Sequence, residues 1–304
     1  MALPPEQDLI TQWEREQSSL KELLQDGDTE SWQTRADFTG LERVGGVDLS
    51  FIKGDDANAC AQLVVLSFPE LKVLYEDSQL VTLSAPYVAG FLAFRETPSL
   101  LEALKKLERT QPALMPQVVF VDGNGLFHYR EFGLACHLGV LSGLPCIGVA
   151  KNLLQVQGVA KDKEHASQIQ ALQKGGDTFP LIAESGRVLG KALRSSDSSS
   201  KPVYVSVGHR ISLDTAVRLT HACCRHRVPE PIRQVALLIY RSLPLWNLLP
   251  SPQRFLHCCS RSSSCAHETP EAPWTSRRRG RHALQRVPAQ TLSLHKLQKG
   301  GGQA

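Results

Sequence analysis

The sequence of 304 residues has no run of about 18 apolar residues, which is the length that a helix needs to cross a membrane. Its first residues, MALPPEQDLI, also lack the basic group followed by an apolar stretch that is typical of a secretory signal. We therefore expect an intracellular protein with no membrane partner. The 42% of hydrophobic residues are sufficient for a buried core.

The eight cysteines lack the spacing of a zinc site. Cys223 and Cys224 are adjacent, as are Cys258 and Cys259, whereas paired zinc ligands are separated by about two to four residues. Three others lie within apolar stretches: Cys60, Cys136 and Cys146. Such positions favour reduced thiols in a core, so we expect neither a zinc site nor disulfides.

Acidic residues are scarce in residues 235–304, which hold ten Lys and Arg against two Asp and Glu, a net of +8. Because the whole chain carries +4, residues 1–234 carry −4. We predict a globular domain over residues 1–234 and a basic, Ser/Pro/Arg-rich, poorly ordered tail over residues 235–304. The tail's cluster SRRRGRHALQR is typical of a solvated segment, an RNA-binding segment or a nuclear address, and the sequence leaves these open.

Apolar patterns within residues 1–234 predict alternating strands and helices. The expected strands are residues 43–53, 59–67, 73–83, 117–121, 145–150, 187–193 and 203–207. The expected helices are residues 9–25, 90–109, 131–141 and 213–224. Pro98 is expected to kink or restart the second helix, and Ser212 to cap the last one.

Three carboxylates lie in hydrophobic segments: Asp48 in RVGGVDLSFIKG, Glu96 in APYVAGFLAFRE and Asp122 in PQVVFVDGNG. Each one alone is more often an ordinary strand-end or turn residue. Burying three is costly unless a cation or strong hydrogen bonds compensate, and oxygen ligands indicate a hard metal such as Mg²⁺. A Mg²⁺ ion held by few carboxylates keeps positions open for phosphoryl oxygens, which points to chemistry on a phosphate.

The order of elements, β-β-β-α-β-α-β, resembles the ribonuclease H-like fold, an α/β fold with a mixed sheet flanked by helices. In that fold the first and fourth strands lie side by side. This arrangement would place Asp48 near Asp122, with Glu96 supplied by the first helix of the series. The convergence of the three acids is stronger evidence than any one of them.

Longer strings resemble the endonuclease V family in its vertebrate form. They occur in the family's order between about residues 12 and 234: GGVDLSF, PYVAGFLAFRE, VDGNG, GVAK and VSVGHRISL. The resemblance implies a Mg²⁺-dependent endonuclease, with Mn²⁺ as a substitute, that recognises inosine preferably in single-stranded RNA, with deaminated DNA as a secondary substrate. It implies cleavage of the second phosphodiester bond 3′ to inosine, which leaves a 5′-phosphate and a 3′-hydroxyl. We expect a monomer in the cytoplasm, to which the resemblance adds a nucleolar or nuclear presence.

The resemblance assigns roles to single residues. The implied metal ligands are Asp48, Asp122 and Glu96. Lys151 would place a cation near the same strand ends to orient water or neutralise a phosphate, the alternative being a solvated strand-end lysine. His209 would contact the phosphate or assist the leaving group, and His128 is a weaker candidate of the same kind, although a loop histidine is usually polar surface.

The element that recognises the base resembles the family's wedge, here Pro86, Tyr87, Val88 and Ala89. Pro86 stiffens the loop, and the flat ring of Tyr87 can fill the space that an extruded base leaves. The pocket for the base is implied at Gly90, Leu92, Gly123, Gly125 and Gly148. Glycine allows backbone groups to approach a purine edge, although Gly123 and Gly125 are also typical turn residues.

The chain departs from the family after PEPIRQ, where members continue into a helix with an acidic residue that reaches the metal cluster. Here VALLIYRSLPLWNLL follows, and residues 235–267 contain no Asp or Glu. Pro244 and Pro250 are expected to interrupt a helix. We therefore predict weakened metal binding and reduced or absent cleavage. Two other functions stay open: a catalytically inactive inosine-RNA binding protein, and an actin-like ATPase or sugar kinase, which shares this fold.

Overall fold

The computed structural model describes residues 6–52, 55, 57–156, 158–246 and 255–257. The strands are β1 (Arg43–Ile52), β2 (Asn58–Ser67), β3 (Val73–Thr82), β4 (Val118–Asp122), β5 (Cys146–Ala150), β6 (Thr178–Ile182), β7 (Val188–Leu193), β8 (Val203–His209) and β9 (Phe255–His257). The α-helices are α1 (Glu6–Glu22), α2 (Leu92–Thr110), α3 (Leu134–Ser142), α4 (Lys163–Ala171), α5 (Leu213–Ala222) and α6 (Glu230–Trp246). Two 3₁₀ helices are η1 (Ser31–Thr34) and η2 (Pro112–Leu114).

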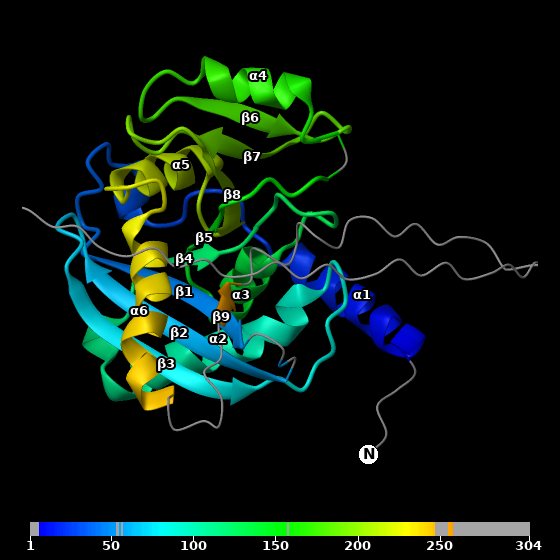
Figure 1. Cartoon of the computed structure of the whole chain (residues 1–304), viewed down its shortest axis with the longest axis vertical. Helices are drawn as coiled ribbons and strands as arrows, with labels where there is room; N and C mark the ends of the chain where they lie inside the picture. Colours follow the sequence, from blue (N-terminus) through cyan, green and yellow to red (C-terminus); the bar gives the residue numbers. More distant parts are fainter. Residues whose placement is uncertain (1–5, 53–54, 56, 157, 247–254, 258–304) are drawn as a thin grey trace, which may run out of the picture. The chain divides into compact units, whose positions relative to one another are not determined.

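Within the described residues the strands form one mixed sheet in the order β3-β2-β1-β4-β5-β8-β7-β6, and β9 pairs with β1 (Figure 1). The pairs β1–β4 and β4–β5 are parallel, and every other pair is antiparallel. The first and fourth strands therefore lie side by side, as the sequence predicts. The predicted α/β class with a mixed sheet flanked by helices is confirmed.

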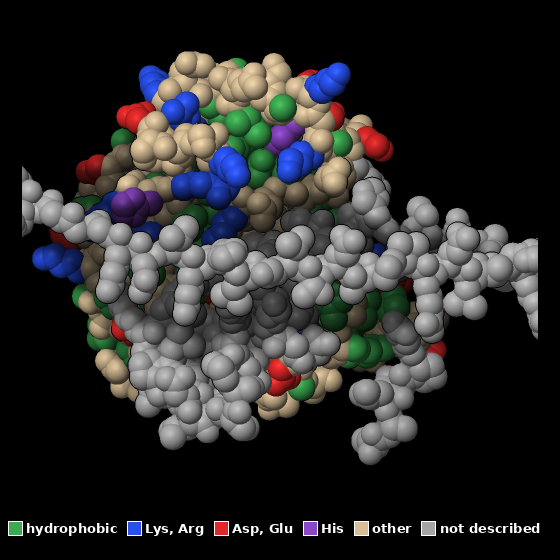
Figure 2. Space-filling model, viewed as in Figure 1, with side chains coloured by type: hydrophobic (Ala, Val, Ile, Leu, Met, Phe, Trp, Pro, Cys, Tyr) green, Lys and Arg blue, Asp and Glu red, His purple; other side chains and the backbone are tan. Residues whose placement is uncertain are grey.

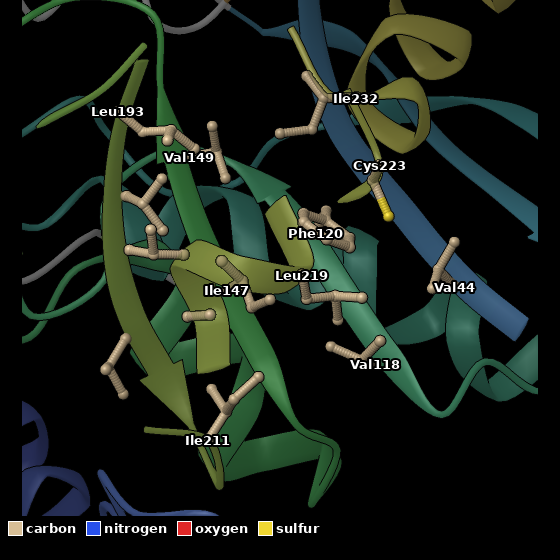
Figure 3. Close-up of a cluster of buried hydrophobic side chains, with 14 of the residues drawn as sticks. Val44, Val118, Phe120, Ile147, Val149, Leu193, Ile211, Leu219, Cys223 and Ile232 are labelled. Atoms are coloured by element: carbon tan, nitrogen blue, oxygen red, sulfur yellow. The ribbon is translucent and has the colours of Figure 1, made fainter. Parts of the chain in front are cut away.

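Helices cover both faces of the sheet, because successive residues of a buried strand point to opposite sides. Val47 of β1 packs in one core with Leu100 and Leu104 of α2. Val44 of the same strand packs on the other face, in a core that includes Ile232 of α6 (Figure 3). Each large apolar side chain that is fully buried contributes about 1.5–3 kcal/mol, so the two cores hold the central strands, and the residues at their ends, in fixed positions.

The elements predicted from the sequence are observed close to their expected positions. Ser212 caps α5 as predicted, since its hydroxyl accepts a hydrogen bond from the Thr215 backbone N–H at 3.3 Å. The five cysteines in the described part of the chain are free. Pro98 does not end α2, which continues through it to Thr110, and its side chain lies on the exposed side of the helix. Helix α4 and strand β6 were not predicted.

Helix α6 runs across residue 234, where the predicted domain boundary lies, and it continues through Pro244. The expected interruption at Pro244 is wrong: the helix continues for two residues beyond it to Trp246, and the missing N–H of Pro244 removes one hydrogen bond near the helix end. Pro250, Cys258, Cys259 and the arginine cluster lie outside the described residues, so the tail's organisation stays a prediction. None of the helices in the described ranges is long and apolar enough to cross a membrane.

Candidate active site

Two buried aspartates lie at neighbouring positions on β1 and β4. The parallel register pairs Val47 with Val121, so the next residues, Asp48 and Asp122, are adjacent and point to the same face of the sheet. Each is 2% exposed. Asp122 is the last residue of β4, whereas β1 continues for four residues beyond Asp48 to Ile52. The adjacency that the sequence predicts for these two acids is therefore present.

Polar side chains that are themselves buried surround Asp48. The Ser50 hydroxyl donates to Asp48 Oδ2 at 3.4 Å and also lies 3.5 Å from Gln62 Oε1. Gln62 is the register partner of Asp48 on β2. Burying a carboxylate in such surroundings costs free energy unless a cation or strong hydrogen bonds compensate. The two aspartates thus provide oxygen donors of the kind that suits a hard cation.

Lys151 is brought to the same place by β5. Val149 of this strand pairs with Asp122, and Lys151 follows two residues later on the same side. Its Nζ lies 2.5 Å from Asp122 Oδ2, whose side chain is 1% exposed. The ion pair places a positive charge at the end of β4, where the sequence predicts it. A solvated strand-end lysine does not describe this geometry.

Glu96 lies in the first part of α2, on the helix layer that covers the opposite face from α6, and it is 0% exposed. Its neighbour Arg95 lies over the ring of Phe51, 5.5 Å from the centroid, and donates to the Ala85 carbonyl at 2.9 Å. The start of α2 is therefore held beside the end of β1. Among the described residues no three His, Cys, Asp or Glu side chains are arranged as a metal site, so the predicted three-acid site stays a prediction.

His209 does not lie with the aspartates, contrary to the prediction. Strand β8 is antiparallel to β5, so Tyr204 pairs with Ala150 and His209 pairs with Cys146 at the other end. His209, the last residue of β8, thus lies at the opposite end of the strands from Asp122. His209 is 6% exposed, its Nδ1 accepts from the Gln25 backbone at 3.3 Å, and burial lowers its pKa.

His128 lies in the loop that follows β4 and is held by that loop. Its Nδ1 accepts a hydrogen bond from the Arg130 backbone N–H at 3.3 Å. Burial, and to a smaller extent the charge of Arg130, lower the pKa of His128 to about 4. The side chain is therefore neutral at pH 7 and carries no charge for a phosphate; its predicted contact with nucleic acid stays a prediction.

The predicted wedge precedes α2 on the surface, close to Glu96. Tyr87 is 40% exposed, and the Phe91 backbone N–H donates to the Val88 carbonyl at 3.0 Å, which closes a turn. Gly90 has a φ of +84°, and a Cβ at this position would meet nothing within 4 Å. Backbone conformation therefore requires glycine at residue 90, and the space around it is open.

Two of the glycines predicted around the base are packed against the protein itself. A Cβ on Gly148 would lie 2.5 Å from the Gly125 backbone nitrogen, and a Cβ on Gly125 would lie 2.0 Å from the Val207 carbonyl oxygen. Both positions require glycine for this close approach. Gly123 has ordinary contacts, with Leu134 at 3.4 Å. The predicted roles of these residues and of Leu92 around a base stay predictions.

No pattern in the sequence indicated a pocket of about 530 Å³, which Lys151 helps to line. Its lining residues come from several loops, α4 and the start of β8: Tyr129, Lys151, Asn152, Leu153, Gln155, Lys161, Asp162, His165, Ala166, Ile169, Lys201, Pro202, Tyr204 and Arg227. Figure 2 shows Lys and Arg side chains gathered on this face over β7, β8 and α5, around an apolar area. The basic residues are too dispersed along the chain to form a motif.

Residues 27–237 match the sequence profile of the Endonuclease V family. The chain belongs to the endonuclease V family. It is 64% identical over 255 residues to Endonuclease V of Mus musculus, covering 83% of this chain and 75% of the mouse protein. It is 61% identical over 249 residues to Endonuclease V of Homo sapiens, covering 82% of this chain and 88% of the human protein.

Solved structures of the family share this fold. The catalytic domain of human Endonuclease V superposes with a TM-score of 0.79 at 57% identity, covering 81% of this chain and 100% of that one. Ciona intestinalis Endonuclease V, in complex with a 24mer DNA containing an inosine followed by a ribo-adenosine, has a TM-score of 0.72 at 37% identity, with 79% and 99% covered. The predicted family and ribonuclease H-like fold are confirmed, and the chain is a nuclease of this family. The match argues against an ATPase or sugar kinase.

Proposed function

We propose that this chain is a Mg²⁺-dependent endonuclease that cuts nucleic acid at the second phosphodiester bond 3′ to inosine, with single-stranded RNA preferred and deaminated DNA as a second substrate. The observation that carries the proposal is the pair of buried aspartates on neighbouring parallel strands, with Lys151 in contact with Asp122. The inosine in the DNA bound by the Ciona relative supports the choice of base. We expect a monomer that acts in the cytoplasm and the nucleolus.

The residues present fit a divalent metal. Asp48 and Asp122 would hold Mg²⁺ or Mn²⁺ through carboxylate oxygens, with Glu96 as the third acid, because buried oxygen donors at adjacent positions select hard cations. When bound, the metal polarises a phosphate and lowers the pKa of a water molecule. Lys151 holds the Asp122 carboxylate in place and adds positive charge where the phosphate must lie.

The wedge residues would separate the inosine from its neighbours. Tyr87 is exposed and lies in a loop that Pro86 stiffens, so its ring can stack where the base has left. Gly90 gives the open, left-handed backbone position at the start of α2. Hypoxanthine presents O6 and N1–H where adenine has an amine and a lone pair, so backbone groups can distinguish the two bases without charged side chains.

We also propose that this form cuts slowly, because α6 carries no acidic residue in a place where family members are expected to have one. Helix α6 packs on the face of the sheet that carries the aspartates: a Cβ on Gly46 would lie 2.3 Å from the Pro231 carbonyl oxygen. Glu230 is the acid of α6, and Arg233 binds it through two hydrogen bonds. The missing carboxylate favours a second candidate function, an inosine-RNA binding protein with little or no cleavage.

Cleavage of end-labelled single-stranded RNA, with inosine or adenosine at one position, tests both candidates. With Mg²⁺ we expect cleavage of the inosine strand one nucleotide beyond the modified base, and at least about a hundredfold loss in Asp48→Asn and Asp48→Ala, since the metal site supplies several kcal/mol. A variant that replaces residues 235–246 with an acidic family helix should cut faster. Binding without cleavage in both forms of the protein would favour the inosine-RNA binding protein. Equal binding of inosine and adenosine strands would refute both candidate functions.

A further inference from the structure

We infer that the pocket beside Lys151 binds the nucleotide on the 3′ side of the cut bond, and this inference rests on the proposed function. The pocket measures about 530 Å³, which is within the range for a small-molecule or nucleotide site. Its lining contains four Lys and Arg residues and one Asp, a net charge that attracts a polyanion. One of its lining residues, Lys151, contacts Asp122, so the pocket adjoins the proposed catalytic site.

Two lysines in the pocket are available to phosphates. Lys161 and Lys201 are exposed, and neither is in an ion pair within the described part of the chain. The other cations have partners: Lys151 binds Asp122, and Arg227 donates to the carbonyls of Lys151, Lys201 and Pro202. Arg227 thus joins the loop after β5 to the loop before β8 and fixes the shape of the pocket.

The one acid in the lining, Asp162, is held at the N-terminus of α4. One oxygen of Asp162 accepts a hydrogen bond from the His165 backbone N–H at 2.8 Å and caps α4. The wall behind it is rigid, since His165 Nε2 lies 3.0 Å from the Tyr204 hydroxyl and both residues are 6% exposed. Burial lowers the pKa of His165, so this wall is neutral at pH 7.

An aromatic ring at the entrance can hold a base. Tyr129 follows β4 by a short loop, lines the pocket together with Lys151 and is 46% exposed. A base stacked on such a ring gains binding energy whatever its identity, because every base has a flat π-face. An exposed ring beside two uncompensated lysines is the combination that single-stranded nucleic-acid sites use.

The order of the strands sets the direction of the bound chain. Along the edge of the sheet, the start of α2 and the predicted wedge lie beside the end of β1, Asp122 ends β4, and the pocket lies beyond β5 and at the start of β8. A nucleic acid with its inosine near the wedge therefore passes Asp122 before it reaches the pocket. Because the proposed cut is 3′ to inosine, the pocket receives the 3′ segment.

Anisotropy of labelled single-stranded inosine RNA, measured on the full chain in EDTA, tests the inference without cleavage. The variant Lys161→Ala/Lys201→Ala removes both lysines, and Lys72→Ala/Lys105→Ala removes two exposed lysines elsewhere. We expect the pocket variant to lower the slope of log K against log salt by about 1.4, at about 0.7 for each phosphate contact, relative to this control. Equal slopes in the two double variants would overturn the inference.

Substrates shortened one nucleotide at a time from either end test the direction. Removal of 3′ nucleotides should weaken binding to the unchanged protein and have little effect on the pocket variant, whereas removal of 5′ nucleotides should affect both equally. Tyr129→Ala should lose at least about fivefold in affinity, and Tyr129→Phe, which keeps the ring, should not. A pocket variant that becomes insensitive to the 5′ end, or no effect of Tyr129→Ala, would contradict the inference.

The same measurements separate this inference from the proposed function. Inosine and adenosine strands of equal length are compared on the unchanged protein, and a lack of preference would refute inosine recognition. The effect of the lysines on salt dependence and on 3′ length is read from each strand alone. Recognition can therefore fail while the pocket is upheld, and the reverse result is equally visible.

Discussion

His137 of α3 is enclosed by aromatic rings and is 3% exposed. Its ring lies edge-on to Phe94 at 4.8 Å and tilted against Phe132 at 5.8 Å. Within the residues that the structure describes, its Nδ1 has no hydrogen-bond partner. Desolvation lowers the pKa of His137 to about 4, so the residue is neutral in the folded protein at pH 7.

This burial makes stability depend on pH. The unfolded state binds the proton near pH 6.5 and the folded state near pH 4, so the stabilising contribution is complete above pH 6.5 and is lost as the pH falls toward 4. We expect His137→Leu to reduce the acid-induced loss of unfolding free energy by about 3 kcal/mol, measured by urea titrations between about pH 7 and pH 4. Other groups with a lowered pKa, His128 among them, contribute to the remaining loss. An unchanged pH profile in the variant would contradict this explanation.

At the residue scale, the sequence correctly placed the site residues that lie on parallel strands. It misplaced the site residue on a strand that runs in the opposite direction. Asp48, Asp122 and Lys151 come from mutually parallel strands, so their order in the chain is also their order along one edge. His209 ends a strand that runs the other way, and alternation of apolar residues carries no information on direction. The close packing of Gly148 against the Gly125 backbone could not be predicted, because the two residues lie in different segments of the chain, and the role of Gly148 around a base stays a prediction.

At the scale of elements, the contact between α6 and β1 depends on the absence of a side chain. Gly46 lies two residues before Asp48, and a Cβ there would meet the Pro231 carbonyl oxygen at 2.3 Å and the Pro231 carbonyl carbon at 2.5 Å. These are backbone atoms of the first turn of α6, which cannot move without moving the helix. The closeness of this helix to the aspartates therefore depends on residue 46.

We expect Gly46→Ala to displace α6 and to lower the unfolding free energy by about 1–3 kcal/mol, the usual cost of overpacking. Gly27→Ala is the matched control, because a Cβ at residue 27 would meet nothing within 4 Å and the residue is exposed. Urea unfolding of both variants measures the difference. If Gly46→Ala stays within about 0.5 kcal/mol of the control, the helix adapts and the close contact is not a constraint.

Sequence patterns predicted the central strands and their flanking helices, because strong apolar periodicity marks elements that are buried on both sides. Strand β6 was missed because Pro180 lies within it, and proline argues against a strand unless the strand is at an edge; β6 is the edge strand. Helix α4 was missed because few of its nine residues are apolar, and a single buried residue, His165, faces the core. Of these two elements, helix α4 lines the pocket beside Lys151.

At the scale of the whole molecule, a segment near the C-terminus returns to the sheet. Strand β4 pairs with β1 from Val44 to Val47, and β9 pairs with the next part of β1, from Ser50 to Ile52. The pairing with β9 therefore begins where the pairing with β4 ends, directly past the two aspartates. Neither β9 nor its pairing with β1 could be predicted from the sequence, because a short pairing between segments about 200 residues apart leaves no periodic pattern.

Because β9 pairs with β1 directly past the two aspartates, we expect it to compete with nucleic acid for this position. Leu256→Pro, which disrupts β9, should therefore raise the affinity of the full chain for single-stranded inosine RNA by about tenfold. Proline removes a backbone N–H and is not accommodated within a paired strand, and a few ladder hydrogen bonds contribute on the order of 1 kcal/mol. Leu256→Val keeps the backbone donor and serves as the control. Anisotropy titrations in EDTA give the comparison, and a proline variant that binds no better than the valine variant would show that β9 leaves the nucleic-acid path open.

Because β9 is covalently tethered to the domain that it pairs with, its effective concentration at β1 is set by the connecting chain and does not fall when the protein is diluted. A ligand that needs residues 50–52 of β1 competes with β9 of the same chain. Its apparent dissociation constant equals the intrinsic one divided by the fraction of molecules in which β9 is not paired with β1. Such self-competition would look the same at nanomolar and micromolar protein, which distinguishes it from blockage by a second copy.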